Sequence, residues 1–535
     1  MNSKYKDSNK NPSEDLILTI DNGTQSIRAL LFDLQGNLVA KSQLVLDPYF
    51  SPQPGWAEQH PDYFWQKLTE VCQQLWQQAD VIEQNFKSRI VAMTLTTQRG
   101  TVINLDKDGK PLRPAILWLD QRLAEIEEEY KGMMPWYWQV LFGLVGQTKM
   151  VNYFRRKAQA NWFSQNQAKL WYSTDKFLLL SGFLTYKLTD NFKDSIGCQV
   201  GYLPFNYKKQ QWSSKFDWKW HALHIKPSML PKLVAPGESL GVLTVEAAQA
   251  IGLDAGLSVI ASASDKACEV LGSGCIEPNV ASISYGTTAT INTNNTKYVE
   301  PQSFLPPFPS AIPKQYNSEV MIYRGFWMVK WFKREFGQHE LLQAVKQGIR
   351  PEILLDELVK KVPAGSMGLM LQPYWSPGLK HLDAKGAMIG FGDVHTKAHV
   401  YRAILEGLAY GLKDGKQSIE KRQKKKITQL MVSGGGSQSD VAMQLTADIF
   451  NLPVHRPHTF ETSGLGAAIN VAVGLGYFDD YKQAIKTMTR TVKTFSPDPK
   501  HVDLYQQLFE QVYLKMYRQL KPLYKSIKKI TGYPE

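Results

Sequence analysis

The stretch Leu16–Asp33, L-I-L-T-I-D-N-G-T-Q-S-I-R-A-L-L-F-D, carries the clearest fold signal of the chain. Its first part is apolar and rich in β-branched residues, which predicts a buried strand. Asn22-Gly23 breaks this run, and an Asn-Gly pair between two strand-like runs is a strong hairpin signal. Ser26–Asp33 is therefore expected to form the returning strand.

The tip of this hairpin carries polar side chains beside a strand end. Asp21 ends the first strand, and Gly23, Thr24, Ser26 and Arg28 follow it. Backbone N–H groups and hydroxyls in such a turn can bind a phosphate, and Asp21 is placed to hold a hydrated cation. An ordinary hairpin with a polar tip explains the same residues, so both interpretations stay open on this stretch alone.

Length and charge limit the classes of protein. With 535 residues the chain is too long for one core, so two large domains are expected. The net charge of +13 is spread along the chain, and the densest basic runs are 422–426 and 525–529. Runs this short are typical of solvated faces, so we expect no nucleic-acid partner, while an anionic small molecule would suit a basic protein.

Cysteine usage and hydropathy indicate a cytoplasmic protein. The four cysteines have neither C-x-x-C nor zinc spacing, which favours reduced, buried thiols. Residues 1–14 are polar and are expected to form a disordered tail. No run of 18 apolar residues exists, so we expect no membrane partner. The aromatic segment 133–153 is interpreted as a buried helix or a subunit interface, hence a homodimer, rather than as membrane-surface attachment.

The first half of the chain has the pattern of an α/β layer domain. Three successive strands within 16–46 form a meander, a helix begins at Pro61, and a strand at 90–97 ends at Gln98-Arg99. Two further strands, at 102–105 and 115–118, are expected to continue the same sheet. A helix is expected at 176–188.

The second half repeats the opening theme. After a linker at 234–242, a strand at 257–263 is expected to mark the start of a second domain. Strand 280–285, the turn Gly286-Thr287-Thr288 and a return at 289–292 then form a second strand–Gly-Thr–strand unit. Three more features follow. Strand 427–433 leads to the turn Gly434-Gly435-Gly436 and a helix at 437–450, and a small-residue helix is expected at 463–476. A C-terminal helical stripe of Leu504, Leu508, Val512 and Met516 is then interrupted by Pro522.

In this order the motifs resemble those of the FGGY carbohydrate kinases. They are D-N-G-T-Q-S-I-R (21–28), Q-R (98–99), I-L-W-L-D-Q-R (116–122), S-A-S-D (262–265), Y-G-T-T (285–288) and S-G-G-G-S (433–437). Residues 386–406 resemble the C-terminal signature of that family, with Phe391 in place of the usual aliphatic residue. The resemblance covers about Leu16 to Pro499 and is strongest for an uncharacterised branch similar to xylulose, glycerol and autoinducer-2 kinases.

The resemblance implies a two-lobed α/β fold of the actin-like, ribonuclease H-like ATPase class, with a central cleft. Each lobe would be a mixed five-stranded sheet flanked by helices. The expected domains are a sugar-binding N-terminal domain at 15–262, a nucleotide-binding C-terminal domain at 263–500 and a helical extension at 501–535. Asp21 and Asp265 would then come from different lobes.

The resemblance also implies the roles of individual residues, with ATP and Mg²⁺ as cofactors. Asp265 matches the catalytic base, although as the first residue of an expected helix it could be only an N-cap. Asp21 matches the second catalytic carboxylate, which holds the magnesium. The remaining expected ligands of ATP are Gly23, Thr24, Ser26, Arg28, Gly286, Thr287 and Thr288 at the phosphates, and Gly434, Gly435, Gly436 and Gln438 at the adenosine.

Substrate contacts are expected from Gln98, Arg99, Trp118, Trp327 and Asp265 itself, with a core aromatic as the alternative for Trp118. Glycerol kinases have a glutamate after the Gln-Arg pair, whereas this chain has Gly100. The expected activity is transfer of the γ-phosphate of ATP to a terminal hydroxyl of a sugar or polyol, with a ketopentose-like substrate favoured over glycerol. The alternatives are an actin- or chaperone-type ATPase and a non-catalytic sugar-binding regulator.

Overall fold

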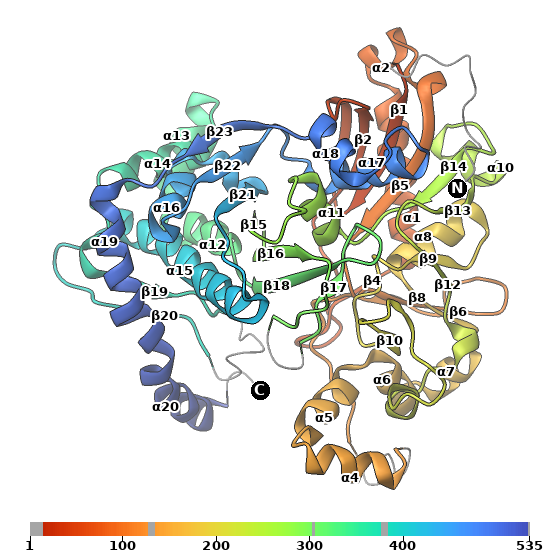
Figure 1. Ribbon diagram of the computed structural model, residues 1–535, viewed down its shortest axis with the longest axis horizontal. Helices are drawn as coiled ribbons and strands as arrows, with labels where there is room; N and C mark the ends of the chain where they lie inside the picture. Colours follow the sequence, from red (N-terminus) through yellow and green to blue (C-terminus); the bar gives the residue numbers. More distant parts are fainter. Residues whose placement is uncertain (1–13, 127–133, 302–304, 376–383, 533–535) are drawn as a thin grey trace. The chain divides into compact units, whose positions relative to one another are not determined.

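The computed structural model describes residues 14–126, 134–301, 305–375 and 384–532, which form two compact units (Figure 1). The first unit comprises residues 1–272, 308–316 and 463–489, and the second comprises 273–307, 317–462 and 490–535. The chain thus leaves the first unit ten residues later than the expected boundary at 262, and returns to it twice. The tail predicted for residues 1–14 lies, except for Glu14, outside the described residues.

A six-stranded sheet forms the centre of the first unit. Its strands, in spatial order, are β13 (Ser239–Val242), β14 (Ser258–Ala261), β5 (Ile90–Thr97), β1 (Leu16–Asn22), β2 (Ser26–Asp33) and β3 (Leu38–Val45). The predicted hairpin and meander are confirmed, with Asn22 opposite Ile27 across β1 and β2. β14 runs parallel to β5, which itself runs parallel to β1. The strand expected to open the second domain therefore belongs to the first sheet.

Strand periodicity divides the residues of β1 and β2 between two faces. Leu16, Leu18 and Ile20 pack with helix α1 (Pro61–Trp76), which begins at the predicted proline. Residues on the opposite face, such as Leu30, meet helix α17 (Thr462–Gly474), where Gly464 allows close approach. α17 in turn packs on α11 (Asp265–Gly272) through Gly466. Because successive side chains alternate, Asp21 and its cross-strand neighbour Arg28 lie on the α11–α17 face.

A second, four-stranded sheet of this unit was not predicted. Its order is β4 (Glu58–Gln59), β7 (Ala115–Ile116), β6 (Val102–Leu105) and β8 (Lys176–Leu179). The strands near 102 and 115 were expected to extend the first sheet, and this was wrong because β6 pairs with β8 instead. The same pairing takes Lys176–Leu179 out of the predicted helix, so α8 spans Leu180–Thr189.

The aromatic segment 133–153 forms two helices, α4 (Trp136–Leu144) and α5 (Thr148–Lys157), with Met133 outside the described residues. α4 has no buried residue, so a helix buried within the chain was a wrong prediction. The other elements of this unit are α2 (Ala79–Glu83), α6 (Gln159–Asn166), α7 (Ala168–Ser173), β9 (Lys193–Ser195), β10 (Phe205–Asn206), β11 (Gln211–Trp212), α9 (Lys219–Ala222), β12 (Lys232–Val234), α10 (Val245–Ile251), β17 (Phe308–Pro309) and α18 (Tyr481–Met488).

The second unit repeats the topology of the first. Within it the sheet order is β18 (Tyr316–Ile322), β16 (Ala289–Asn295), β15 (Val280–Tyr285), β21 (Gln429–Ser433), β22 (Val454–Pro457) and β23 (Thr491–Phe495). As in the first unit, the hairpin is antiparallel, two parallel pairings follow, and an antiparallel strand closes the edge. The predicted repeat is confirmed, and this edge strand adds a sixth strand to the five expected in each half.

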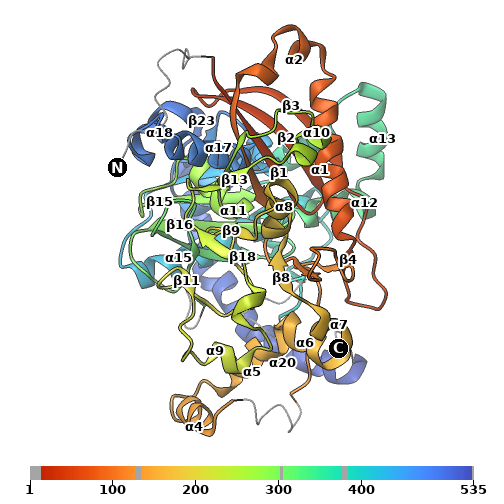
Figure 2. The ribbon, with the colours of Figure 1, turned by 90° about the vertical axis from the view of Figure 1, so that its right-hand side faces the viewer.

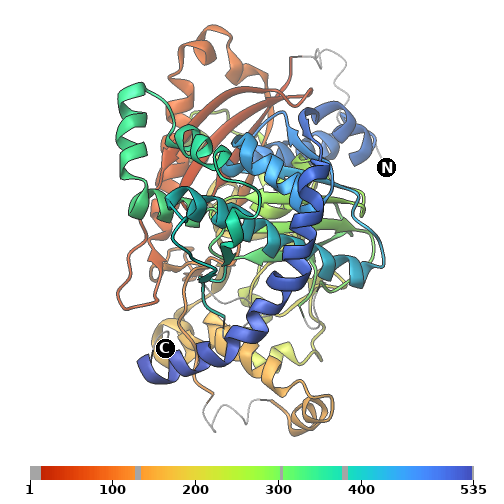
Figure 3. The ribbon, with the colours of Figure 1, turned by 90° about the vertical axis from the view of Figure 1, so that its left-hand side faces the viewer.

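The helices of the second unit are α12 (Trp327–Phe336), α13 (Gln338–Gln347), α14 (Pro351–Lys360), α15 (Lys397–Gln423), α16 (Asp440–Phe450), α19 (Pro499–Gln507) and α20 (Leu514–Thr531), with a short β19 (Met370–Gln372) and β20 (Ala387–Ile389). Figure 3 shows α19 and α20 in dark blue. The buried residues of these helices and of the π-helical turn Leu508–Tyr513 between them are Tyr505, Phe509, Tyr513, Met516 and Tyr524. The predicted stripe was thus one residue off except at Met516, and Pro522 lies inside α20.

Candidate active site

Three of the predicted site residues follow parallel strands of the first unit. Asp21 lies at the end of β1, Gln98 follows β5, and Asp265 lies four residues after β14. The register places Asp21 beside Thr96, and Leu95 beside Ala261. Because the carboxyl ends of parallel strands meet at one sheet edge, the three side chains belong to the same edge, where open α/β sheets bind ligands.

Asp21 is buried and forms an ion pair with Arg28, whose guanidinium donates to Asp21 Oδ2 at 2.8 Å. The predicted turn follows, with the Gly23 N–H donating to the Ser26 carbonyl at 3.1 Å. Asp21 also lies near α11, because its charge contributes to the pKa of the buried Cys268 thiol, which burial raises to about 11. Asp21 therefore lies near the helix that begins with Asp265.

Thr24 connects this hairpin to two of the predicted substrate residues. The indole Nε1 of Trp118 donates to Thr24 Oγ1 at 2.9 Å, and Thr24 Oγ1 donates to Gln98 Oε1 at 3.0 Å. Trp118 is half-buried, so its ring belongs to this polar chain rather than to the interior of the core. Sequence analysis assigned Thr24 to phosphate and the other two to substrate, and the structure brings all three together.

Asp265 is half-buried at the first position of α11, where the Lys266 N–H donates to its Oδ1 at 2.7 Å. Burial raises its pKa above the usual value, and the positive charges of Arg99 and Lys266 partly oppose that rise. A carboxylate with a raised pKa accepts a proton more readily, which suits a general base. The geometry is also that of a residue at a helix start, so both predicted roles remain compatible with it.

Arg99 lies beside two aromatic residues that sequence analysis missed. Its guanidinium is 5.1 Å from the centre of the Phe308 ring, and Phe308 is 6.1 Å from the Tyr207 ring. These residues are more than a hundred positions apart in sequence, so no local pattern joins them to Arg99. The following residue, Gly100, has φ +68°, a conformation that favours glycine, so its lack of a side chain also has a backbone reason.

A short loop supports the segment before Asp265. The hydroxyl of Ser195 donates to the Ser262 carbonyl, Gly197 forms a β-bridge with Ala263, and the Ser264 N–H donates to Gly197 O at 3.1 Å. A Cβ on Gly197 would lie 2.5 Å from that of Ala263, so only glycine allows this approach. The position of the carboxylate thus depends on a loop that sequence analysis left unassigned.

The second predicted phosphate turn lies in the second unit. The Gly286 N–H donates to Thr288 O at 3.1 Å, which closes the turn between β15 and β16. The Gly286 and Thr287 carbonyls accept from the Phe326 and Trp327 N–H groups at 3.0 and 3.4 Å, where α12 begins. Trp327, predicted to bind substrate, is therefore held next to this turn.

The glycine turn at 434–436 lies beside the same hairpin. Gly434 has φ +81° and approaches the backbone of Tyr285, and Gly436 lies against the Phe326 ring, which is 4.5 Å from the Tyr285 ring. A short 3-10 turn at 435–438 follows, so α16 begins three residues later than predicted. Gln438 accepts a hydrogen bond from Arg350.

The predicted site residues therefore divide between the two units. Asp21, Arg28, Gln98 and Asp265 all belong to the first, whereas both Gly-rich turns belong to the second. The expectation that the two carboxylates come from different lobes was wrong, because β14 pairs with β5 and carries Asp265 into the first sheet. Among the described residues no group of three or more His, Cys, Asp and Glu side chains could hold a metal ion.

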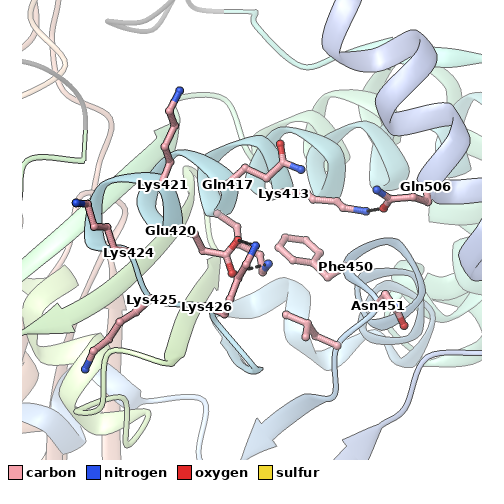
Figure 4. A pocket seen from close by; sticks show the side chains of 12 residues that line it. Lys413, Gln417, Glu420, Lys421, Lys424, Lys425, Lys426, Phe450, Asn451 and Gln506 are labelled. Atoms are coloured by element: carbon pink, nitrogen blue, oxygen red, sulfur yellow. Dashed lines mark hydrogen bonds and ion pairs between the residues drawn. The ribbon is translucent and has the colours of Figure 1, made fainter.

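The second unit also has a pocket of about 790 Å³ at the C-terminal end of α15, which none of the predicted site residues lines (Figure 4). Six lysines and Glu420 surround it. Glu420 already pairs with Lys416 and Lys426, and the amino groups of Lys421, Lys424 and Lys425 point away from one another. Basic side chains at a helix C-terminus complement its dipole, and this arrangement needs no ligand.

Comparison with known proteins agrees with this division. The model of the N-terminal domain of the FGGY family of carbohydrate kinases matches residues 16–272, and that of the C-terminal domain matches 281–475. The chain is 31% identical over 502 residues to the uncharacterized sugar kinase YgcE of Escherichia coli K12, covering 94% of this chain and 93% of that protein. It is 30% identical over 509 residues to the xylulose kinase of Lactococcus lactis, covering 94% and 96%.

The fold is likewise shared with solved structures. The ligand-bound xylulose kinase from Lactobacillus acidophilus matches with a TM-score of 0.76 at 21% identity, covering 97% of this chain and 99% of that one. The chain therefore belongs to the FGGY family of carbohydrate kinases, as the motifs predicted. It is a phosphotransferase whose acceptor is an alcohol group.

Proposed function

We propose that this protein transfers the γ-phosphoryl group of ATP to a terminal hydroxyl of a ketopentose-like sugar or polyol in the cytoplasm. The observation that supports it best is the gathering of Asp21, Gln98 and Asp265 at one edge of the first sheet. Four free, buried cysteines are consistent with a reducing compartment.

In this proposal Asp265 is the general base for the substrate hydroxyl. Its raised pKa favours proton uptake, and the nearby positive charge of Arg99 limits that rise. Gln98 can accept or donate a hydrogen bond to a hydroxyl, while Arg99 can only donate. The half-buried Trp118 ring offers an apolar surface to the carbon chain of the substrate.

The residues present fit ATP and Mg²⁺. The turns at 23–28 and 286–288 present backbone N–H groups and hydroxyls, which are donors for phosphate oxygens. Mg²⁺ keeps several waters and binds through one or two carboxylates plus phosphates, so Asp21 alone is a sufficient protein ligand. Bound Mg²⁺ would neutralise charge on the β- and γ-phosphates. At the glycine turn 434–436, Gly435 has open space around it where the adenosine could approach, and Gln438 lies at the end of that turn.

Two observations favour a ketopentose-like substrate over glycerol. The Lactococcus lactis relative, which matches over nearly the whole chain, is named a xylulose kinase. Gly100 also leaves the position after Arg99 without a carboxylate, so the hydroxyl acceptor of glycerol kinases is missing there.

The proposal is tested by measuring ADP release across ketopentoses, polyols and sugar acids. We expect release that depends on one substrate class and falls about 10²- to 10⁴-fold in Asp265→Asn, while nucleotide binding is retained. Asp254→Asn, at an exposed aspartate in the first unit, is the matched control. Sugar-independent ADP release would favour the actin- or chaperone-type ATPase. Sugar binding without turnover would favour a regulator.

The metal role is tested separately with Asp21→Asn. We expect turnover to require a higher Mg²⁺ concentration, because a neutral amide is a weaker ligand for a hard cation. The sugar KM should change less than the apparent Mg²⁺ affinity. Full activity at low Mg²⁺ would contradict this assignment.

A further inference from the structure

Helix α4 and the turn after it expose an apolar surface, here called the α4 face, at an end of the first unit away from its six-stranded sheet (Figures 1 and 2). Trp136 is 76% exposed and Leu144 is 81% exposed. The exposed apolar residues of the face are Trp136, Tyr137, Val140, Leu141, Leu144 and Val145. A contiguous apolar surface of this kind marks a site of interaction.

The opposite side of α4 is anchored to the unit. The Trp138 and Phe142 rings stack at 5.6 Å, and Phe142 packs on Trp218 at 5.4 Å. Met134, Val151 and Ala222 form the small core beneath them. Contacts on this side therefore hold α4 in place, and the side chains on its other side are exposed on a folded helix.

The described charges near the α4 face are mostly positive, and Asp217, next to Trp218, is paired with Lys219. No Asp or Glu occurs between residues 130 and 174, whereas six lysines and arginines do. Lys149 and Arg156, both on the neighbouring α5, are exposed. The surface thus combines Trp, Tyr and Leu side chains with a cationic border.

This combination fits an anionic lipid surface better than a second copy of the chain. An isologous dimer places the same patch on both partners, so the exposed Lys149 and Arg156 of one copy would face a patch that carries the same cations. A bilayer with anionic headgroups supplies the opposite charge, and its interface accommodates Trp and Tyr rings. In the described part of the chain no helix is long and apolar enough to cross a membrane, so the contact would be peripheral.

We propose that the α4 face binds the surface of an anionic bilayer, with α4 lying in the plane of the headgroups. This departs from the expectation of no membrane partner, which rested on the absence of a spanning segment and on α4 being buried. Insertion of Trp136 and Leu144 provides the apolar contribution, and Lys149 and Arg156 provide attraction to the headgroups.

The test is co-sedimentation of the whole protein with phosphatidylcholine vesicles, with or without about 30% phosphatidylglycerol. We expect binding only with the anionic lipid, and its loss at about 0.5 M salt. Replacing Lys149 and Arg156 together by Gln should weaken the partition constant roughly 25-fold, because each cation near the surface contributes about fivefold. Trp136→Gln with Leu144→Gln should weaken it at least as much.

The matched control replaces Leu342 and Val345 by Gln, since these side chains are also exposed and apolar but lie on α13 of the second unit. It should bind vesicles like the unchanged protein. Sugar phosphorylation without vesicles should be normal in every variant, which shows that each is folded. Equal binding to neutral vesicles, or face variants that bind normally, would overturn the proposal. So would a dimer in solution that the Trp136/Leu144 variant dissociates.

Discussion

The substitution Asp194→Asn is expected to make stability less dependent on pH, because Asp194 is a buried carboxyl whose hydrogen-bond donors are all uncharged. Its Oδ2 accepts hydrogen bonds from Ser181 Oγ at 2.9 Å and Gln199 Nε2 at 2.8 Å, and its Oδ1 accepts from the Ser195 N–H at 2.8 Å. Burial nevertheless raises its pKa from 3.8 to about 7, since desolvation outweighs these hydrogen bonds.

The sign follows from proton binding. Between about pH 4 and pH 7 the folded protein holds a proton on Asp194 that the unfolded chain has lost. The free energy of unfolding therefore falls as the pH rises through this range and levels off above it. One pH unit corresponds to about 1.4 kcal/mol, so between about pH 5 and pH 8 this group removes about 3 kcal/mol of stability.

The assay is urea unfolding of the unchanged protein and of Asp194→Asn at about pH 5 and pH 8. The amide cannot ionise, so the variant should gain about 3 kcal/mol relative to the unchanged protein between these pH values. At the lower pH it should be less stable by about 1 kcal/mol, because an amide cannot reproduce all three hydrogen bonds. The same pH dependence in both proteins would refute a buried, proton-holding Asp194.

Three further predictions concern the second unit and the hairpin. Gly436→Ala should raise the nucleotide KM more than the sugar KM, since a Cβ there overlaps the Phe326 ring; unchanged nucleotide kinetics would remove this turn from the ATP site. Trp118→Phe removes the 2.9 Å hydrogen bond to Thr24 and should cost about 1 kcal/mol in kcat/KM, measured by coupled assay. Arg402→Met leaves a buried carboxylate one helical turn away without its cation, so thermal unfolding should show a loss of about 3–5 kcal/mol with normal sugar KM.

Local sequence signals predicted the parts of the site that lie at strand ends. Asn22-Gly23 and Gly286-Thr287 interrupt apolar runs, and both turns occur where these pairs predict them. A turn needs only its own residues to form, so the sequence around it is sufficient evidence. Family resemblance, rather than pattern alone, supplied the chemical roles proposed for these positions.

Pairing between distant segments left no comparable signal. β8 was predicted as helix because K-F-L-L-L is an apolar run of undetermined period, and only its pairing with β6 decides the outcome. The contact between Phe308 and Arg99 was not predicted for the same reason, because it joins distant segments of the chain. The exposure of a side chain also depends on tertiary contacts. From sequence alone an aromatic helix such as α4 is therefore predicted to be buried.

Because both carboxylates belong to the first unit, the two units are expected to have different roles in the reaction. If the base and the metal ligand share one sheet edge, their spacing is set by strand register, with Asp21 beside Thr96 and Leu95 beside Ala261, and not by domain closure. The second unit then contributes two of the turns proposed to bind ATP, at 286–288 and 434–436. Kinetic effects should separate accordingly: variants near Asp265 should alter turnover at saturating ATP, and variants near Gly436 should act through nucleotide affinity. Gly197 pairs with the segment before Asp265 and belongs to neither proposed ligand site. A Gly197 variant should therefore lower turnover and leave nucleotide affinity intact. This separation is expected if strand register, rather than domain closure, sets the position of the base.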